Sequence, residues 1–399
     1  MHQTVPNRKA SVLIVTENFP NKVESYRGIY ILEQLREIAK EYNVHVVVPL
    51  NVASRWVFSF LSQAREKNID GIHVYYLKYP YLPFERFIPH LSAITRNVYR
   101  RYLLNRLYRK AVKLGRKYPF TLIHGQEAMI GDLAIPLGER LGVKTLFTVH
   151  TLRDESVRSL GRETMDSVIE NLKRADRIIA VSNLARQSYA GLLDLSKTTV
   201  VYNGVDEGKM ACSKPRNCTT VVLLSVCHLV ELKKIDLILA ALRDIKQQDG
   251  AAFHYRIVGG GNTHPYRRLI RQYGLEKQVD VVGPVPPGEI AGYYAACDVF
   301  VLPSVRESFG IVFLEAMLCG RPVICSSQSG FSEIIEDGKE GFIVQPDDPL
   351  DLKQKLLTLM QNPELRLRMG EAGKRLAARF TMERQAQEIL AVYQSLMQA

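Results

Sequence analysis

Long apolar runs are missing from this sequence of 399 residues. The longest uninterrupted apolar stretches, such as VVLLSVC at 221–227, are far shorter than the roughly 20 residues that cross a bilayer as a helix. The basic N-terminus has only a short apolar segment before Thr16 and Glu17, which is too little for the core of a signal peptide. The sequence therefore predicts a cytoplasmic protein without a membrane-spanning helix.

Cysteine is also scarce, and its spacing argues against the usual structural roles. The six cysteines stand at positions 212, 218, 227, 297, 319 and 325, with no C-x-x-C pair and no paired histidines to complete a zinc site. We therefore expect neither structural zinc nor a disulfide scaffold.

Acidic residues are too few in the first half of the chain to balance the basic ones. The net charge is +12, and residues 1–205 hold 30 Lys and Arg against 18 Asp and Glu, whereas residues 206–399 hold 23 of each. The whole basic excess therefore belongs to the first half. The apolar share of 46% is ordinary for a globular protein, and the length predicts two to three domains.

Short β-branched runs alternate with helix-length segments along the chain. In the first half the expected strands are 11–16, 44–48, 72–77, 121–125, 144–150, 177–182 and 198–202. After a polar linker at 203–218, strands are expected at 220–226, 254–259, 279–283, 299–303, 322–326 and 341–344. Nearly continuous apolar strands joined by helices are typical of parallel sheets covered on both faces. The sequence thus predicts an α/β protein with two doubly wound, Rossmann-like domains facing a cleft.

The expected domains are residues 1–203 and residues 204–380. The tail at 381–399 opens with a Thr cap and carries Ile389, Val392, Tyr393 and Leu396 at helical spacing. We expect this C-terminal helix to pack back on the first domain. Ligands of such sheets bind at the carboxyl ends of the strands, so the motifs found there carry most information about function.

The most informative stretch is PSVRESFGIVFLEAMLCGRPVI at 303–324. It passes from an expected strand through a tight loop into a helix, whose first backbone N–H groups suit a diphosphate. The residues expected at that helix start are Ser308, Phe309, Gly310, Ile311 and Val312. Glu307 and Glu315 flank it with seven residues between them, and they could accept hydrogen bonds from hydroxyls at the two ends of a nucleotide-sugar. Spacing alone also allows an ordinary helix residue and a loop carboxylate.

At ESFGIVFLEAM (307–317) the sequence resembles the E-x7-E signature of the retaining nucleotide-sugar glycosyltransferases with the GT-B fold, in the large family numbered four. Further segments resemble that family in the same order. They are FTVHTLRD (147–154), VSNLARQ (181–187), VYNGVD (201–206), HLVELKKIDLILAA (228–241) and RIVGGG (256–261). The resemblance covers almost the whole chain.

The resemblance implies that Glu315 binds the ribose of the donor and that Glu307 contacts sugar hydroxyls near the reacting carbon. It assigns Lys233 to the donor phosphates, where a cation stabilises the charge of the leaving diphosphate. The chain has His228 and Lys234 where the family has an arginine and a glycine, so we expect these two residues in a modified phosphate clamp. The alternative is that Lys233 and Lys234 are solvated charges at a helix start.

A glycine triplet, Gly259, Gly260 and Gly261, follows an expected strand and precedes a helix, as a nucleotide-binding loop does. His264 stands where a dinucleotide fingerprint needs another glycine, which argues against a dehydrogenase. The resemblance places this loop near the donor and Val285 near the base. A bare glycine triplet can also be only a turn.

In the first domain the resemblance places Arg27 and Gly28 at a turn that the donor phosphate and the acceptor approach, with Asn203 on the same side. His150 ends the fifth strand and matches a family histidine near the transferred sugar, which implies a catalytic role. A histidine at a strand end can also be structural. With Lys233 supplying positive charge and no D-x-D-like pair at a strand end, we expect neither a metal ion nor another cofactor.

Residues 86–117 contain ten basic residues and no acidic one, with apolar residues at helical spacing. A basic amphipathic helix suits an anionic membrane surface. The expected membrane contacts are Arg96, Arg100, Arg101, Arg109, Lys110 and Lys113. Nucleic acid is a competing polyanion, but no RNA- or DNA-binding motif accompanies the charge, so we expect no nucleic-acid partner. A solvated helix packed on the sheet is the third interpretation.

These observations predict a hexosyltransferase that moves a sugar from a UDP- or GDP-sugar to an acceptor hydroxyl, with retention at the anomeric carbon. The expected acceptor is a glycan, a lipid-linked sugar or a small molecule, in polysaccharide, cell-surface glycan or glycolipid synthesis. Peripheral binding to the inner face of the membrane is a further expectation. The alternatives are a GT-B sugar-nucleotide epimerase and a non-catalytic partner in glycan assembly.

Overall fold

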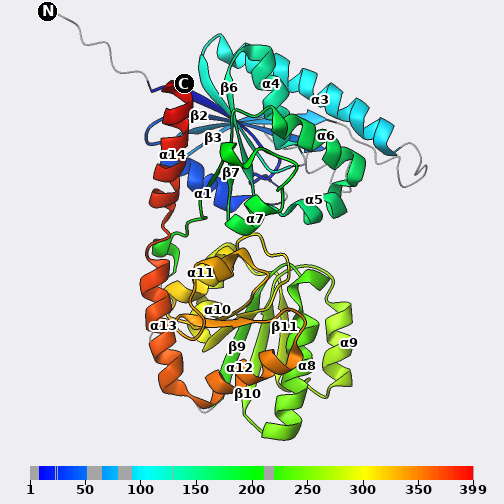
Figure 1. Cartoon of the computed structure of the whole chain (residues 1–399), viewed down its shortest axis with the longest axis vertical. Coiled ribbons are helices and arrows are strands. Elements are labelled where there is room, and N and C mark those ends of the chain that lie inside the picture. The colour runs from blue at the N-terminus through cyan, green and yellow to red at the C-terminus, as the bar shows by residue number, and fades with distance from the viewer. Residues whose placement is uncertain are drawn as a thin grey trace, which may run out of the picture. The chain divides into compact units, whose positions relative to one another are not determined.

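The computed structural model describes residues 9–22, 24, 26–51, 65–79, 92–128, 130–210 and 220–398. The chain forms two compact units, which we call unit 1 (Met1–Tyr202 and Met382–Ala399) and unit 2 (Asn203–Thr381). Each unit has its own largely parallel sheet with helices on both faces (Figure 1). The predicted fold class of two doubly wound, Rossmann-like α/β domains is confirmed.

The sheet of unit 1 has eight strands in the order β3-β4-β2-β1-β5-β6-β7-β8. The strands are β1 (Ser11–Val15), β2 (Asn43–Asn51), β3 (Glu66–Ile69), β4 (Ile72–Tyr79), β5 (Phe120–Gln126), β6 (Lys144–Val149), β7 (Arg177–Ala180) and β8 (Thr198–Val200). All neighbours pair in parallel except β3, which pairs antiparallel with β4 at the edge. The sequence analysis missed β3 because this strand is polar and mostly exposed.

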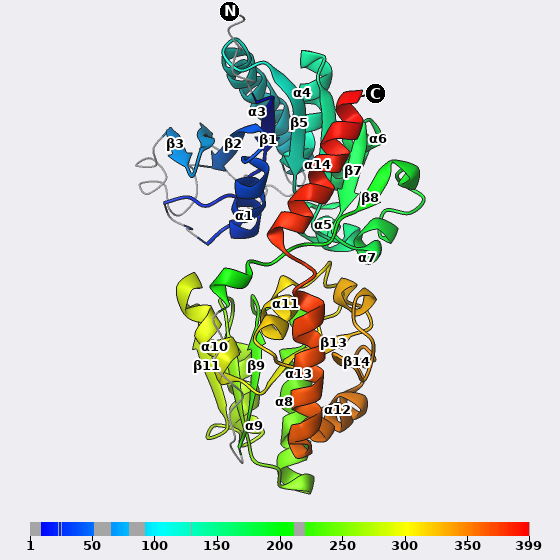
Figure 2. The same ribbon diagram turned by 90° about the vertical axis from the view of Figure 1, so that its left-hand side faces the viewer.

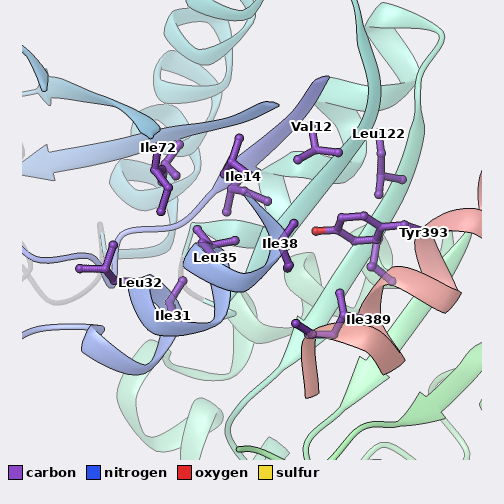
Figure 3. Close-up of a cluster of buried hydrophobic side chains, with 14 of the residues drawn as sticks. Val12, Ile14, Ile31, Leu32, Leu35, Ile38, Ile72, Leu122, Ile389 and Tyr393 are labelled. Carbon is purple, nitrogen blue, oxygen red and sulfur yellow. The ribbon is translucent and has the colours of Figure 1, made fainter. Parts of the chain in front are cut away.

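Helices cover both faces of this sheet because side chains of successive strand residues point to opposite faces. The helices are α1 (Ile29–Ile38), α3 (Ser92–Gly115), α4 (Ala134–Leu141), α5 (Arg153–Leu160), α6 (Arg162–Lys173), α7 (Asn183–Gln187) and α14 (Met382–Gln398), with short 3-10 turns η3 (Gly131–Leu133) and η4 (Leu195–Lys197). Val12 and Ile14 of β1 pack with α1 and α14 (Figure 3), whereas Leu13 and Val15 pack with α3 and α4.

The last helix, α14, belongs to the core of unit 1 although it follows unit 2 in the sequence (Figure 2). Its Ile389 and Tyr393 are fully buried against the sheet and α1. The Tyr393 hydroxyl also bonds to Nδ1 of buried His124 at 2.8 Å, and Nε2 of that ring bonds to Thr148 Oγ1 at 2.7 Å. The helix is therefore held by apolar packing and by a buried hydrogen-bond chain.

The sheet of unit 2 has six parallel strands in the order β11-β10-β9-β12-β13-β14. They are β9 (Val221–Val226), β10 (Phe253–Val258), β11 (Val279–Gly283), β12 (Val299–Leu302), β13 (Val323–Ser326) and β14 (Gly341–Val344). The helices are α8 (Ile235–Asp244), α9 (His264–Gln272), α10 (Ile290–Ala296), α11 (Ile311–Leu318), α12 (Pro349–Gln361) and α13 (Pro363–Ala377). Short 3-10 turns are η5 (Glu207–Lys209), η6 (Glu231–Lys233), η8 (Pro287–Glu289) and η9 (Gly330–Glu333), and η7 (Ile245–Asp249) is a short π-helix.

Two expectations about the chemistry of the chain have a structural outcome. Among the described cysteines, Cys227, Cys297 and Cys325 are free, but Cys319 is in a disulfide bond, so one bridge forms where the sequence analysis expected no disulfide scaffold. Within the described residues, none of the helices combines the length and the apolar character needed to span a bilayer. The predicted linker at 203–218 lies partly outside the described residues.

Candidate functional site

The strand order of unit 2 reverses between β9 and β12. On one side of this point β9 is followed by β10 and β11, and on the other side β12 is followed by β13 and β14. Doubly wound sheets bind ligands at such a switch point, outside the carboxyl ends of the strands. The segment after β9 carries His228 and Lys233, and the segment after β12 carries Glu307 and Gly310. The fold therefore brings two of the predicted donor-binding segments to one edge of the sheet.

Lys233 and Glu307 meet at this edge. The Lys233 ammonium donates to Glu307 Oε2 at 2.5 Å, and the two side chains are 21% and 15% exposed. The backbone reinforces the contact, because the Val305 N–H donates to the Leu232 carbonyl at 3.0 Å. The site thus holds a cation and a carboxylate that are sheltered from water but still reachable by a ligand.

The loop that carries Glu307 has unusual backbone conformations. Arg306 has a left-handed φ of 61°, and Gly310, which precedes α11, has φ 93°. The Glu307 carbonyl accepts from the Gly330 N–H at 2.8 Å. A non-glycine residue in the left-handed region costs free energy and persists only where the surroundings enforce it. The loop is therefore held in one shape, with the start of α11 directly behind Glu307.

Glu315 lies on α11, and its carboxylate is positioned by a buried tyrosine. Tyr294 of α10 donates its hydroxyl to Glu315 Oε2 at 2.6 Å. Tyr294 is fully buried, and burial together with the negative charge of Glu315 raises the pKa of its hydroxyl well above the usual value. The phenol therefore stays protonated and fixes one carboxylate oxygen of Glu315. The sequence analysis missed Tyr294, whose only signal is its place in the helix before β12.

The glycine triplet packs against the segment that follows β9. A Cβ atom on Gly259 would lie 1.8 Å from the Cys227 carbonyl oxygen, and one on Gly261 would lie 2.7 Å from the Leu229 carbonyl oxygen. Both glycines also have positive φ angles, so no other residue fits there without displacing the backbone. The Leu229 N–H donates to the Gly260 carbonyl at 2.7 Å, and exposed His228 lies beside Gly260.

Two of the predicted donor-binding residues point elsewhere. Lys234 forms an ion pair with Asp347 at 2.7 Å, and this hydrogen bond raises the pKa of the lysine. The Phe309 ring is buried and contacts the Phe331 ring, so this side chain belongs to the core of unit 2. Ser308, Ile311 and Val312 are half-buried around that helix start. Val285 is also half-buried, two residues beyond Gly283, whose carbonyl accepts from the Gly259 N–H at 2.8 Å.

In unit 1, Gly28 precedes α1 with φ 63°, and a Cβ atom there would lie 2.1 Å from the Asn18 carbonyl oxygen in the loop after β1. Arg27 donates to Asn18 Oδ1 at 2.9 Å and to Glu24 at 3.1 Å. Asn203, the first residue of unit 2, is buried. The structure therefore places Arg27 and Gly28 together and assigns Asn203 to the other unit.

His150 follows β6 and belongs to a buried polar chain. Gln126 donates its amide N–H to Gln34 Oε1 at 3.0 Å, and its own Oε1 lies 3.1 Å from His150 Nε2. With that oxygen as acceptor, Nε2 carries the proton and Nδ1 is the basic nitrogen. Burial lowers the pKa of His150, so the ring is neutral at neutral pH. The edge of the Tyr30 ring contacts the imidazole, with ring centroids 5.2 Å apart.

The predicted membrane contacts on α3 fall into two groups. Arg100 is turned inward to the fully buried Asp132, so its assignment to a membrane surface is wrong. Lys110 pairs with the exposed Glu66 at 2.8 Å, and its assignment stays a prediction. The spacing of basic residues along one helix does not show which of them pair with acidic residues of other helices and strands. Arg101, Arg109 and Lys113 are exposed. The side chain of Arg96 lies outside the described residues.

In the described part of the chain, no group of three or more His, Cys, Asp or Glu residues is arranged to hold a metal ion. Three polar pairs described above lie at the strand edges: Lys233 with Glu307, Tyr294 with Glu315, and Gln126 with His150.

Comparison with family models and known proteins agrees with this arrangement. Residues 28–209 match the model "Glycosyltransferase Family 4", and residues 211–376 match the model "Glycosyl transferases group 1". An uncharacterized glycosyltransferase of Methanocaldococcus jannaschii is 28% identical over 77% of this chain and 84% of its own length. The D-inositol 3-phosphate glycosyltransferase of Thermobifida fusca is 27% identical over 72% of each chain.

Solved structures share the fold. Sucrose-phosphate synthase from Thermosynechococcus elongatus superposes with a TM-score of 0.78 at 20% identity, over 97% of this chain and 99% of that one. Anabaena HepE in complex with UDP and glucose superposes with a TM-score of 0.74 at 18% identity, over 97% and 100%. The two family models together span nearly the whole described chain, and the chain therefore belongs to the group 1 glycosyltransferases of family four and is a glycosyltransferase.

Proposed function

We propose that this enzyme transfers a hexose-type sugar from a nucleoside diphosphate sugar to an acceptor hydroxyl and retains the configuration of the anomeric carbon. The observation that supports this proposal most strongly is the Lys233–Glu307 pair at the switch point of unit 2. It lies beside the start of α11, where backbone N–H groups and the helix dipole favour an anion.

Each residue of this site has its own part in the proposed reaction. Lys233 would leave Glu307 for the donor diphosphate and stabilise the negative charge that this leaving group gains in the transition state. Glu307, released from the lysine, would accept hydrogen bonds from hydroxyls of the transferred sugar. Glu315, positioned by the hydroxyl of Tyr294, would accept hydrogen bonds from the ribose hydroxyls. Charge-assisted hydrogen bonds of this kind are the strong ones in protein sites.

UDP is the first donor nucleotide to test. The Anabaena HepE structures were solved with UDP, with UDP and glucose, and with UDP-glucose. Lys233 supplies the positive charge that a divalent ion would otherwise bring to the diphosphate, so the proposal includes no metal requirement.

The exposed basic face of α3 supports a second part of the proposal, which is peripheral binding to an anionic membrane. Val98 and Tyr102 are 62% and 41% exposed on the same helix as Arg101, Arg109 and Lys113. Basic and exposed apolar or aromatic side chains together are typical of helices that lie on a membrane surface. Such binding would bring the enzyme to lipid-linked or membrane-proximal acceptors in polysaccharide or glycolipid synthesis.

Calorimetric titration with UDP, GDP and their sugar conjugates tests the donor assignment. We expect one nucleotide to bind the wild type and to bind Glu315→Gln and Lys233→Ala at least tenfold more weakly. Glu371→Gln, an exposed carboxylate of α13 in the same unit, is the matched control and should bind as the wild type does. Equal binding by all four proteins would contradict the assignment.

Product analysis separates transfer from its two rivals. An epimerase would change the sugar of the donor without any acceptor, and a non-catalytic partner would change nothing. Retention is read from the anomeric coupling constant of the product by NMR. An inverted product would contradict that part of the proposal while leaving the donor site intact.

A further inference from the structure

Unit 1 has a switch point of its own, between β1 and β5, from which successive strands run outward in opposite directions. Val15 of β1 pairs with Gly125 of β5. Glu17 and Glu127 each stand two residues beyond that pair, so both carboxylates project from the carboxyl edge at the point where such sheets bind ligands. Neither residue belongs to the donor-type site of unit 2.

Only 8% of Glu17 is exposed, and its carboxyl group forms no hydrogen bond with another described residue. Burial raises the pKa of its carboxyl group to about 7, with the negative charge of Glu127 raising it further and the positive charge of Arg27 opposing the rise. A carboxyl group with little access to water and no protein partner is costly to ionise. The carboxyl group of Glu17 can therefore form hydrogen bonds with a ligand.

Glu127 is held in place by two hydrogen bonds. Its backbone is left-handed, with φ 71°, and its N–H donates to the Thr148 carbonyl of β6. Its Oε1 accepts from the Tyr30 hydroxyl at 2.7 Å, and Tyr30 comes from α1 on the other side. This unfavourable backbone conformation is maintained by its surroundings, as is usual at functional sites. Half-buried Glu127 thus presents a fixed carboxylate beside Glu17.

The positive charges near the pair already have acidic partners. Arg27 bonds to Glu24 and Asn18, and Arg100 bonds to buried Asp132. The adjoining His150 is neutral and presents its Nδ1, which accepts hydrogen bonds. The strand edge is therefore rich in acceptors and carries negative charge. Hydroxyl groups can donate to all of these atoms, whereas a phosphate would meet the negative charge of Glu127 and of the partly ionised Glu17.

We propose that Glu17 and Glu127 form the acceptor subsite and select the uncharged hydroxyl groups of a sugar or polyol against a phosphorylated group at that position. The inference rests on the proposed transferase function, and it names the acceptor chemistry that this function leaves open. A lipid-linked or polymeric acceptor would enter the subsite with its neutral sugar end.

Saturation-transfer NMR on the full chain tests the subsite with matched pairs of probes. The probes are myo-inositol, glucose, mannose and galactose, each beside its own monophosphate at millimolar concentration. We expect at least one neutral probe to give a signal that its phosphate lacks. Glu17→Gln and Glu127→Gln, which keep the side-chain shape, should each reduce that signal at least fivefold. Glu163→Gln, an exposed carboxylate of α6, is the control.

A phosphate probe that binds as well as its neutral partner would overturn the proposal, and so would the absence of any neutral signal or a signal unchanged in both variants. UDP binding is measured in the same samples by calorimetry. Loss of sugar signals with normal UDP binding refutes only the subsite. Normal sugar signals without any nucleotide binding would refute the proposed donor chemistry and leave the subsite standing.

Discussion

At the scale of single residues, Tyr294 is a positioning residue that acts through Glu315. Tyr294→Phe removes the hydroxyl that donates to Glu315 Oε2 and keeps the buried ring. A hydrogen bond to a charged group contributes about 1.5–3 kcal/mol, so we expect the Kd for the donor nucleotide to rise by roughly ten- to a hundredfold. Calorimetry measures this, with kcat at saturating donor expected to change less than KM. Tyr293→Phe, the neighbouring residue of α10, should leave both constants as they are.

Lys233 is expected to supply, at the donor diphosphate, the positive charge that a divalent metal ion would otherwise supply. Activity should therefore survive excess EDTA, whereas Lys233→Ala should lower kcat as well as donor affinity, because the leaving group gains negative charge in the transition state. Initial rates with and without EDTA, at several donor concentrations, measure both effects. Complete loss with EDTA that magnesium or manganese restores would show that a metal ion shares this role.

At the scale of elements, the buried end of β2 makes unit 1 sensitive to acid. Burial, with the positive charges of His73 and Lys117 adding to it, lowers the pKa of His45 to about 4, and its Nδ1 lies 3.2 Å from the Tyr75 hydroxyl. The pKa of His45 in the folded state is below its value of about 6.5 in the unfolded state. The neutral ring therefore contributes its full share to the free energy of unfolding above pH 6.5. This contribution falls as the pH drops towards 4, by about 2 kcal/mol at pH 5.

Urea denaturation at pH 7 and pH 5 measures this dependence. His45→Phe keeps an aromatic ring among its neighbours and cannot be protonated, so its free energy of unfolding should fall less between the two pH values than that of the wild type. Other titrating groups, Glu17 among them, change the free energy of unfolding equally in both proteins, so their contributions cancel in the comparison. An identical fall in the two proteins would show that His45 does not set the acid sensitivity.

The attachment of α14 can be tested through its buried hydroxyl. Tyr393→Phe removes the hydrogen bond to His124 Nδ1 and leaves that nitrogen buried without a partner. We expect the free energy of unfolding to fall by about 1–3 kcal/mol. Tyr42→Phe, whose ring packs against Tyr393 in a half-buried position, is the matched control and should cost less. Equal losses would mean that packing, and not the hydrogen bond, holds the helix.

At the scale of the whole molecule, the basic excess of the first half should make membrane binding depend on salt. Each basic residue near an anionic leaflet contributes about 1 kcal/mol, and salt screens this attraction within about 10 Å. Vesicles with anionic lipid should sediment the wild type at low salt and release it at high salt. Arg101, Arg109 and Lys113 changed together to Glu should abolish sedimentation and leave UDP binding intact.

The control for this experiment makes the same change of charge in unit 2, at exposed Arg268, Arg271 and Lys277. That variant should still sediment if α3 is the membrane surface. If neither the wild type nor the control binds anionic vesicles at low salt, α3 is only a solvated helix, and a soluble acceptor becomes the better hypothesis.

The sequence predicts most of this molecule because its strands are buried on both faces and so consist of short apolar runs. The edge strand β3 lacks that signal, since only Ile69 of its four residues is not exposed. Charged residues are harder to place: Arg100 belongs to the same amphipathic pattern as Arg101, yet it pairs with buried Asp132. Glu17 and Glu127 follow strands without any motif, and only the register of β1 and β5 brings them together.

The place of α14 also has a consequence for synthesis on the ribosome. The chain enters unit 2 at Asn203 and leaves it at Thr381, which pairs with Val205. Domains generally fold as units while the chain is made. Unit 2 is complete once residue 381 has emerged, but unit 1, translated first, still lacks α14. Nascent unit 1 therefore exposes the apolar face around Leu122 and Ile38 throughout translation of unit 2, and it matures last.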